Sequence, residues 1–137
     1  MLAVAGVAAK DGRILLVRDT HGFWSSVGGW IEPGEAPEQA LLREVREELG
    51  VEAEIASVLN PFIAWNVDGR EKPVSFILFL FGLKLKSEDF RLQESEVTAV
   101  TWASPEQWSD LDMLPYVRAL LDERHPEWLR ASAAPVV

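Results

Sequence analysis

Two short apolar segments open the chain, and a turn-forming sequence separates them. Residues 2–9 and 14–18 are rich in aliphatic side chains, and Asp11-Gly12 lies between them. Asp-Gly favours the positive backbone angles of a tight hairpin. We therefore expect an antiparallel pair of strands at the start of the chain.

Apolar residues then recur with a helical period between residues 36 and 49. Four of them fall within one arc of a helix, namely Leu41, Leu42, Val45 and Leu49. Pro37 suits the first helical position, and Gly50 suits the C-terminal cap. The segment before this helix, residues 20–34, is rich in Gly, Ser and Pro, which favours a loop.

The rest of the chain predicts further strands and a closing helix. Residues 51–66 and 74–86 are expected to form two long strands joined at Asp68-Gly69, a second hairpin signal. Both alternating faces of residues 75–83 are apolar, so this strand should be central and covered on both sides. A short strand at 97–102, a turn capped by Ser104 and a helix at 115–123 complete the pattern.

The composition limits what such a chain can be. Its 137 residues, 48% of them hydrophobic, suit one domain, which we place at residues 1–130, followed by a C-terminal tail at 131–137 predicted to be disordered. Without cysteine, any metal must be held by oxygen or histidine. No apolar segment reaches the roughly 20 residues of a membrane span, so we expect a cytoplasmic protein without membrane contact.

A net charge of -9, from 22 acidic and 13 basic residues, narrows the expected partners. Such a surface repels a polyphosphate backbone at long range, which argues against large nucleic acids as partners. A small phosphorylated ligand remains compatible, because a metal cation can invert the local field.

Acidic residues cluster on the predicted helix. Glu44 is an i,i+3 neighbour of Glu47 and an i,i+4 neighbour of Glu48, and such like-charge pairs are unfavourable in a helix. One explanation is a solvated face, with Arg43 pairing to Glu47. The other is a magnesium site, since magnesium takes oxygen ligands from a few carboxylates and completes its shell with water and phosphate. The helix by itself leaves both explanations open.

The segment before the helix favours the metal site. Residues 28–35, Gly-Gly-Trp-Ile-Glu-Pro-Gly-Glu, add a fourth carboxylate and glycines that let the backbone approach a ligand closely. The joint pattern is Gly29, five residues, Glu35, seven residues, and then Arg-Glu-Val-Arg-Glu-Glu-Leu-Gly-Val at 43–51. This resembles the Nudix box at every specified position. The flanking strands, Trp24 and the strand with Trp102 also fit the family's usual layout.

The resemblance implies an α/β fold, a Nudix-type α/β/α sandwich around a mixed β-sheet with the box as a loop-helix-loop. It also implies hydrolysis of a nucleoside diphosphate linked to another moiety, with Mg2+ or Mn2+ as the cofactor. By position in the box, the metal ligands would be Glu44, Glu47, Glu48 and the carbonyl of Gly29. Arg43 would position a carboxylate by ion pairing, and Glu35 would support the loop and the helix.

The resemblance leaves open which group deprotonates the attacking water. The candidates are Glu44 and Glu47 in the box and Glu96 in the loop before residue 97. The candidate substrate contacts are Arg18, where relatives often contact phosphate, Trp24, Gly28 and Gly29. The family's usual Trp-x-Leu-Pro-Gly-Gly is Trp-Ser-Ser-Val-Gly-Gly at residues 24–29, so the loop lacks the backbone restriction of a proline.

The expected function is that of a MutT-like nucleoside triphosphate pyrophosphohydrolase acting on a small nucleotide. Dinucleoside polyphosphates, nucleotide sugars and ADP-ribose are alternative substrates. A Nudix module that senses a nucleotide without cleaving it is the alternative from another class. Such modules usually lose box carboxylates, whereas this chain keeps all of them. The apolar edge strands would permit a homodimer.

Overall fold

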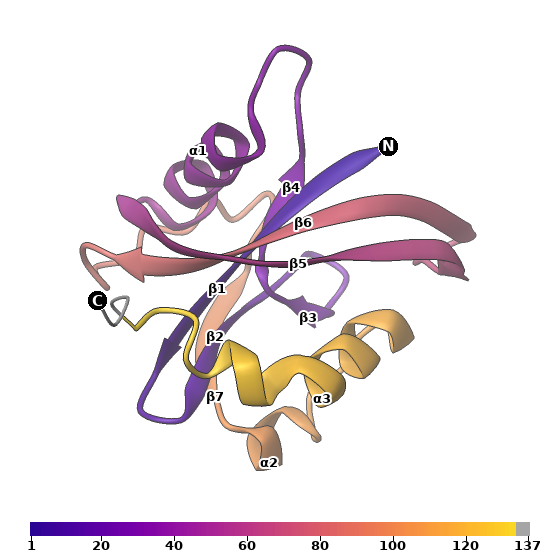
Figure 1. The fold of residues 1–137 in the computed structure, drawn as a ribbon. Helices are drawn as coiled ribbons and strands as arrows, with labels where there is room; N and C mark the ends of the chain where they lie inside the picture. The colour runs from indigo at the N-terminus through magenta and orange to yellow at the C-terminus, as the bar shows by residue number, and fades with distance from the viewer. Residues whose placement is uncertain (134–137) are drawn as a thin grey trace.

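The computed structural model describes residues 1–133 and is built on a mixed seven-stranded β-sheet (Figure 1). The sheet order is β3-β2-β1-β6-β5, while β4 also pairs with β1 and β7 also pairs with β2. The strands are β1 (Leu2–Lys10), β2 (Arg13–Arg18), β3 (Trp24–Ser25), β4 (Val27–Trp30), β5 (Ala53–Asp68), β6 (Pro73–Leu85) and β7 (Ala99–Ala103). The helices are α1 (Pro37–Leu49), α2 (Pro105–Trp108) and α3 (Pro115–Trp128).

Both predicted hairpins are confirmed. β1 and β2 pair antiparallel, and the turn between them holds Asp11 and Gly12 at φ angles of 53° and 74°. β5 and β6 pair antiparallel up to Asp68 and Pro73, so Gly69 begins the turn. β1 runs parallel to β6, which makes the sheet mixed. β6 lies between β1 and β5, the central position expected for a strand with two apolar faces.

Successive side chains of a strand point to opposite faces of the sheet, and this divides the core in two. On β2, Leu15 and Val17 belong to the cluster beneath α1. Ile14 and Leu16 belong to the cluster beneath α2 and α3. Figure 1 shows α1 on one side of the sheet and α2 and α3 on the other. The predicted helix-sheet-helix layering is therefore present.

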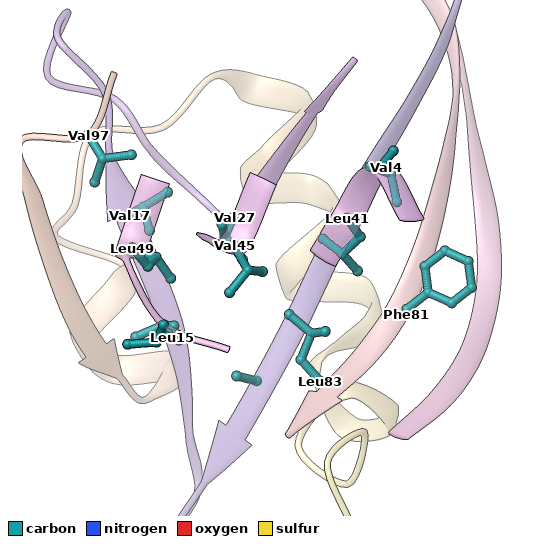
Figure 2. Close-up of a cluster of buried hydrophobic side chains, with 13 residues drawn as sticks. Val4, Leu15, Val17, Val27, Leu41, Val45, Leu49, Phe81, Leu83 and Val97 are labelled. Carbon is teal, nitrogen blue, oxygen red and sulfur yellow. The ribbon is translucent and has the colours of Figure 1, made fainter. Parts of the chain in front are cut away.

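The apolar stripe of α1 sets the rotation of this helix on the sheet. Leu41, Val45 and Leu49 are fully buried in one cluster with Val27 and Leu83. Figure 2 shows Leu41 near Leu83, Val45 near Val27, and Leu49 near Leu15. Burial of an aliphatic side chain contributes about 1.5–3 kcal/mol. Three such side chains on one arc therefore hold the helix in one orientation, which fixes where its polar arc points.

The segment predicted as a loop, residues 20–34, contains the two short strands β3 and β4, so that prediction was wrong in part. β4 pairs antiparallel with β1, with Gly28 opposite Ala5. A side chain at Gly28 would bring its Cβ to 2.0 Å from the carbonyl oxygen of Val4. The glycine that favoured a loop instead lets one strand lie close against another.

The last helix is longer than predicted, because α3 continues beyond residue 123, through Pro126, to Trp128. Proline has no N–H, so the carbonyl of Asp122 loses its helical donor. Nδ1 of His125 lies 3.1 Å from that carbonyl oxygen and compensates when it carries the proton. The buried indole of Trp128 anchors the added turn. None of the helices within residues 1–133 has the length and apolar character needed to cross a membrane.

Residues 131–133, the start of the predicted tail, pack against the sheet. Ala131 is buried, and its carbonyl oxygen accepts a hydrogen bond from the Ser57 hydroxyl at 2.7 Å. The Ser132 hydroxyl accepts a hydrogen bond from the N–H of Ala9 at 2.8 Å. Gly82 leaves room for this segment, because a Cβ there would lie 2.0 Å from the Ala131 carbonyl oxygen. The remainder of the predicted tail, residues 134–137, lies outside the described residues.

β5 forms one edge of the sheet and exposes Val58, Ile63 and Trp65. A register shift between Leu59 and Phe62 interrupts its pairing with β6. An exposed apolar edge is compatible with the homodimer expected from the sequence, and the homodimer stays a prediction.

Candidate active site

Four of the five carboxylates singled out in the sequence line one groove with a volume of about 600 Å³, and Glu35 is not among the described residues that line it. Glu44, Glu47 and Glu48 reach the groove from α1, and Glu96 reaches it from the segment before β7. The double glycine of β4, residues 28–29, lines the same groove. The fold thus brings the box helix, the glycines and a distant loop together. We name this space the acidic groove.

The packing of α1 explains how one helix presents three glutamates to the acidic groove. Val45 and Leu49 are buried against the sheet, so the neighbouring arc of the helix faces the groove. Along that arc Glu48 is buried, the Glu44 side chain is 14% exposed and the Glu47 side chain is 50% exposed. The cluster therefore extends from the protein interior to solvent.

The buried member of the cluster, Glu48, has a strongly shifted pKa. Burial is the largest cause, followed by a hydrogen bond to Glu44 and by the charges of Glu44, Glu96 and Glu47. Together they raise the pKa of Glu48 to about 9. A cation in the groove would oppose this shift, because it favours the ionised carboxylate.

Arg43 joins the loop before α1 to the glutamates of α1. Its Nε donates to Glu35 Oε2 at 2.7 Å, and its Nη2 donates to Glu35 Oε1 at 3.0 Å. Its Nη1 donates to Glu44 Oε1 at 2.9 Å and to Glu47 Oε2 at 3.1 Å. The hydrogen bonds to Glu35 and then Glu44 raise the pKa of Arg43 above its ordinary value. Arg43 and the backbone N–H of Glu32 lower the pKa of Glu35.

The donor set of the acidic groove fits a hard divalent cation. The groove presents carboxylate oxygens, and a cation there would offset the negative charge of the carboxylates that surround Glu48. Within residues 1–133, no three acidic or histidine side chains already hold their donor atoms in a metal-binding arrangement. Nη1 of Arg43 bridges Glu44 and Glu47 instead. This contact uses one oxygen of each carboxylate, Glu44 Oε1 and Glu47 Oε2, and leaves the other oxygen of each outside it.

Gly29 brings the backbone of β4 against the same cluster. A Cβ at this position would lie 2.6 Å from Glu44 Oε1, so a side chain here displaces the carboxylate. The role of the Gly29 carbonyl as a metal ligand stays a prediction.

An apolar cavity of about 310 Å³ adjoins the acidic groove. Its walls come from β1, β6 and α3 and include Phe76, Leu78 and Tyr116. Tyr116 meets Phe76 edge-on, with ring centroids 5.6 Å apart. Six residues line both spaces, namely Ser25, Ser26, Gly28, Gly29, Trp30 and Arg70. A ligand with one apolar part and one charged part fits across this boundary.

Comparison with known proteins decides the family, because residues 2–130 match the NUDIX domain. The chain is a Nudix hydrolase. It is 35% identical over 124 residues to the CTP pyrophosphohydrolase of Escherichia coli K12, a match that covers 87% of each chain. It is 35% identical over 94 residues to the ADP-ribose pyrophosphatase of Methanocaldococcus jannaschii, which covers 64% of this chain and 56% of that protein.

A solved structure supports the same conclusion about the fold. The solution structure of the E. coli ORF135 protein is similar with a TM-score of 0.72 and 29% identity, covering 96% of this chain and 91% of that one. The predicted α/β Nudix fold is therefore confirmed. As a Nudix hydrolase, the chain acts on derivatives of nucleoside diphosphates, and such enzymes generally use divalent metals.

In this Nudix hydrolase the predicted substrate contacts lie in two places. Gly28 and Gly29 line both the acidic groove and the apolar cavity. Arg18 is exposed, donates from Nε to the Thr98 hydroxyl at 2.9 Å, and lies 6.0 Å from the Trp24 ring. Neither Arg18 nor Trp24 is among the described residues that line the acidic groove or the apolar cavity.

Sequence reasoning missed residues that line these spaces in the Nudix hydrolase, above all Asp19, Arg70 and Tyr116. Arg70 pairs with Asp19 at 2.7 Å across 51 positions of sequence. No spacing rule relates two residues this far apart. The one sequence signal near Arg70 was the Asp68-Gly69 hairpin. It predicted that Arg70 lies in a turn, but it gave no indication of which residues that turn contacts.

Proposed function

We propose that this Nudix hydrolase is a nucleoside triphosphate pyrophosphohydrolase, which converts a nucleoside triphosphate and water into a nucleoside monophosphate and pyrophosphate. The observation that carries the proposal is the junction of the apolar cavity and the acidic groove at Gly28 and Gly29. The cavity suits a nucleoside, and the acidic groove suits a phosphate chain that arrives with a metal cation.

The sizes of the two spaces favour one nucleoside per substrate. The cavity volume of about 310 Å³ is at the lower end of the range of about 300–1,000 Å³ for small-molecule sites. A dinucleoside polyphosphate would place its second nucleoside in the acidic groove, and ADP-ribose or a nucleotide sugar would place a sugar there. The CTP pyrophosphohydrolase, which matches over most of both chains, supports the same substrate class.

The residues of the box have distinct proposed roles. The ligands of Mg2+ or Mn2+ would be Glu44, Glu47, Glu48 and the carbonyl of Gly29. A bound cation would supply charge neutralisation on the bridging and leaving oxygens. Arg43 would orient Glu44 and Glu47, and Glu35 would hold Arg43 to the loop.

The chemical step needs a group that takes a proton from water. The water oxygen forms a bond to phosphorus, one P–O–P bond breaks, and its electron pair leaves with the pyrophosphate. Glu44, Glu47 and Glu96 all line the acidic groove, and each is a candidate for this base. A positioned general base contributes typically about 10²–10⁴-fold to the rate.

The substrate class is tested by a hydrolysis screen with product identification. Nucleoside triphosphates, oxidised nucleotides, ADP-ribose, nucleotide sugars and dinucleoside polyphosphates are compared with Mg2+ and with Mn2+. We expect the highest kcat/KM for a nucleoside triphosphate, with a monophosphate and pyrophosphate as products. A higher kcat/KM for ADP-ribose or a nucleotide sugar would overturn the substrate class and leave the family unchanged.

The proposed metal site is tested by Glu47→Gln. The Glu47 side chain is half exposed, so the fold should be preserved, while metal-dependent turnover should fall by about 100-fold or more. Glu38→Gln is the matched control, because Glu38 is exposed on the same helix and is not among the residues lining the acidic groove. Unchanged turnover in Glu47→Gln would refute the proposed mechanism.

A further inference from the structure

Arg70 lies where the apolar cavity meets the acidic groove. It belongs to the turn of residues 69–72, at the end of the long β5–β6 hairpin (Figure 1). Among the six residues that line both spaces, Arg70 is the one with a charged side chain. Arg70 can therefore offer a positive charge to a ligand that spans the boundary.

The guanidinium of Arg70 is held by the loop between β2 and β3. Its Nη2 donates to Asp19 Oδ2 at 2.7 Å, and its Nη1 lies 3.1 Å from Nδ1 of His21. The other carboxylate oxygen of Asp19 accepts the backbone N–H groups of His21, at 2.8 Å, and Phe23, at 3.1 Å. Asp19 is thus fixed to its own loop, and it fixes Arg70 in turn.

Arg70 still has capacity to bind an anion. Its side chain is 43% exposed, and a guanidinium carries five N–H donors, of which Asp19 occupies one and Nδ1 of His21, when it carries no proton, a second. The other basic side chain lining the acidic groove, Arg43, already donates to Glu35, Glu44 and Glu47. Arg70 is therefore the better placed of the two to receive a phosphate.

The charge of Arg70 also reaches the wall of the apolar cavity. Burial raises the pKa of Tyr116, and the positive charge of Arg70 acts in the opposite direction. Tyr116 lines the cavity, so the guanidinium is close enough to influence a group bound there.

We propose that Arg70 binds the phosphate attached to the nucleoside, the α-phosphate, and so sets which P–O–P bond lies over the glutamates of α1. This inference rests on the proposed function. The nucleoside enters the cavity, Arg70 holds the first phosphate at the boundary, and the remaining phosphates extend into the acidic groove. Arg70 binds the phosphate with planar, paired donors, a geometry that lysine lacks.

A purely structural role of the Arg70–Asp19 pair would change ligand binding in a different way from a role of Arg70 in phosphate binding. If the Arg70–Asp19 pair only joined the hairpin to the loop, Asp19→Asn and Arg70→Gln would weaken all ligands alike. If Arg70 binds phosphate, Arg70→Gln weakens phosphorylated ligands selectively, and Asp19→Asn, which keeps the guanidinium, has a smaller effect on them.

The experiment measures binding of cytidine and of CMP, with the other three nucleoside and monophosphate pairs in parallel, to metal-free protein in EDTA. Titrations followed by NMR report on weak binding and need no turnover. We expect Arg70→Gln to weaken monophosphate binding by about 10- to 100-fold, the range for hydrogen bonds to a charged group, and to leave nucleoside binding unchanged. Arg70→Lys should recover only part of the loss.

Lys72→Gln is the matched control, because Lys72 lies in the same turn and is not among the residues lining either space. It removes the same charge and should leave both affinities unchanged. Equal monophosphate affinity in Arg70→Gln and the parent protein would overturn the proposed role of Arg70 and would leave the proposed function standing. Equal loss of nucleoside and monophosphate binding would also overturn it. Absence of monophosphate binding by the metal-free parent protein would overturn the role of Arg70, whereas the hydrolysis screen with Mg2+ and Mn2+ decides the proposed function separately.

Discussion

The guanidinium of Arg43 binds the carboxylate of Glu35 through two hydrogen bonds, of 2.7 and 3.0 Å. Their side chains are 19% and 17% exposed, so water screens the pair less than it screens a surface ion pair. The same guanidinium donates to Glu44 and Glu47. One side chain thus couples the loop geometry to the orientation of two glutamates in the acidic groove.

Arg43→Lys keeps the charge and removes the bidentate geometry. We expect the free energy of unfolding to fall by about 1.5–3 kcal/mol, the range for hydrogen bonds to charged groups, and turnover to fall as well. Urea denaturation and steady-state kinetics measure the two effects. Arg46→Lys is the control, because Arg46 is half exposed on the same helix and its contact with Glu52 is 3.7 Å long. Equal effects of the two substitutions would contradict the role of Arg43.

Glu48 makes the stability of the metal-free protein depend on pH. Its pKa is about 9 in the folded protein and near 4.5 when unperturbed, so the fold retains a proton that the unfolded chain loses as pH rises. The stability linked to this group is fully present below about pH 4.5 and is lost as pH rises through about 9. In EDTA, Tm should decrease across this range, and Glu48→Gln should reduce the decrease. An identical pH profile for the variant would contradict the buried, protonated state of Glu48.

The neighbouring glycines of β4, Gly28 and Gly29, should respond differently to alanine. At Gly28 the new Cβ meets the carbonyl oxygen of Val4 at 2.0 Å, and this backbone cannot move without breaking the β1–β4 pairing. At Gly29 it meets a carboxylate oxygen of Glu44 at 2.6 Å, and this side chain can turn away. Gly28→Ala should therefore lower Tm strongly, and Gly29→Ala should lower turnover with a smaller change in Tm. Thermal denaturation and kinetics on both variants compare the two, and the reverse order would contradict this assignment.

Tyr116 is the one tyrosine of the chain, so the absorbance of its phenolate reports on one site. Burial raises its pKa above 10.0, and Arg70 opposes the shift. The midpoint should lie above 10 in the folded protein, fall towards 10 in urea, and rise further in Arg70→Gln. Stability should decrease as pH rises above 10, because only the unfolded chain then ionises freely. A midpoint that urea leaves unchanged would show that Tyr116 is not buried.

The elements of this fold were largely predictable where their signals are local. Asp11-Gly12 indicated the first hairpin, and Pro37 and Gly50 marked the ends of α1, because these residues act on their own backbone. Features that these local signals did not predict involve contacts distant in sequence. β4 is a strand because it pairs with β1. Ala131 packs against the sheet because its carbonyl oxygen accepts a hydrogen bond from Ser57 and because Gly82 has no side chain to block it.

The sequence by itself determined the family and the box, since Gly29, Glu35 and the helix from Arg43 follow a fixed spacing that one loop and one helix impose. Only the tertiary structure decided what faces that helix. It placed Glu96 at the acidic groove, left Arg18 outside the lining of both spaces, and brought Arg70 to their boundary. The reason is physical: the α1 glutamates are ordered by helical geometry, whereas Arg70 meets Asp19 only after the sheet has assembled.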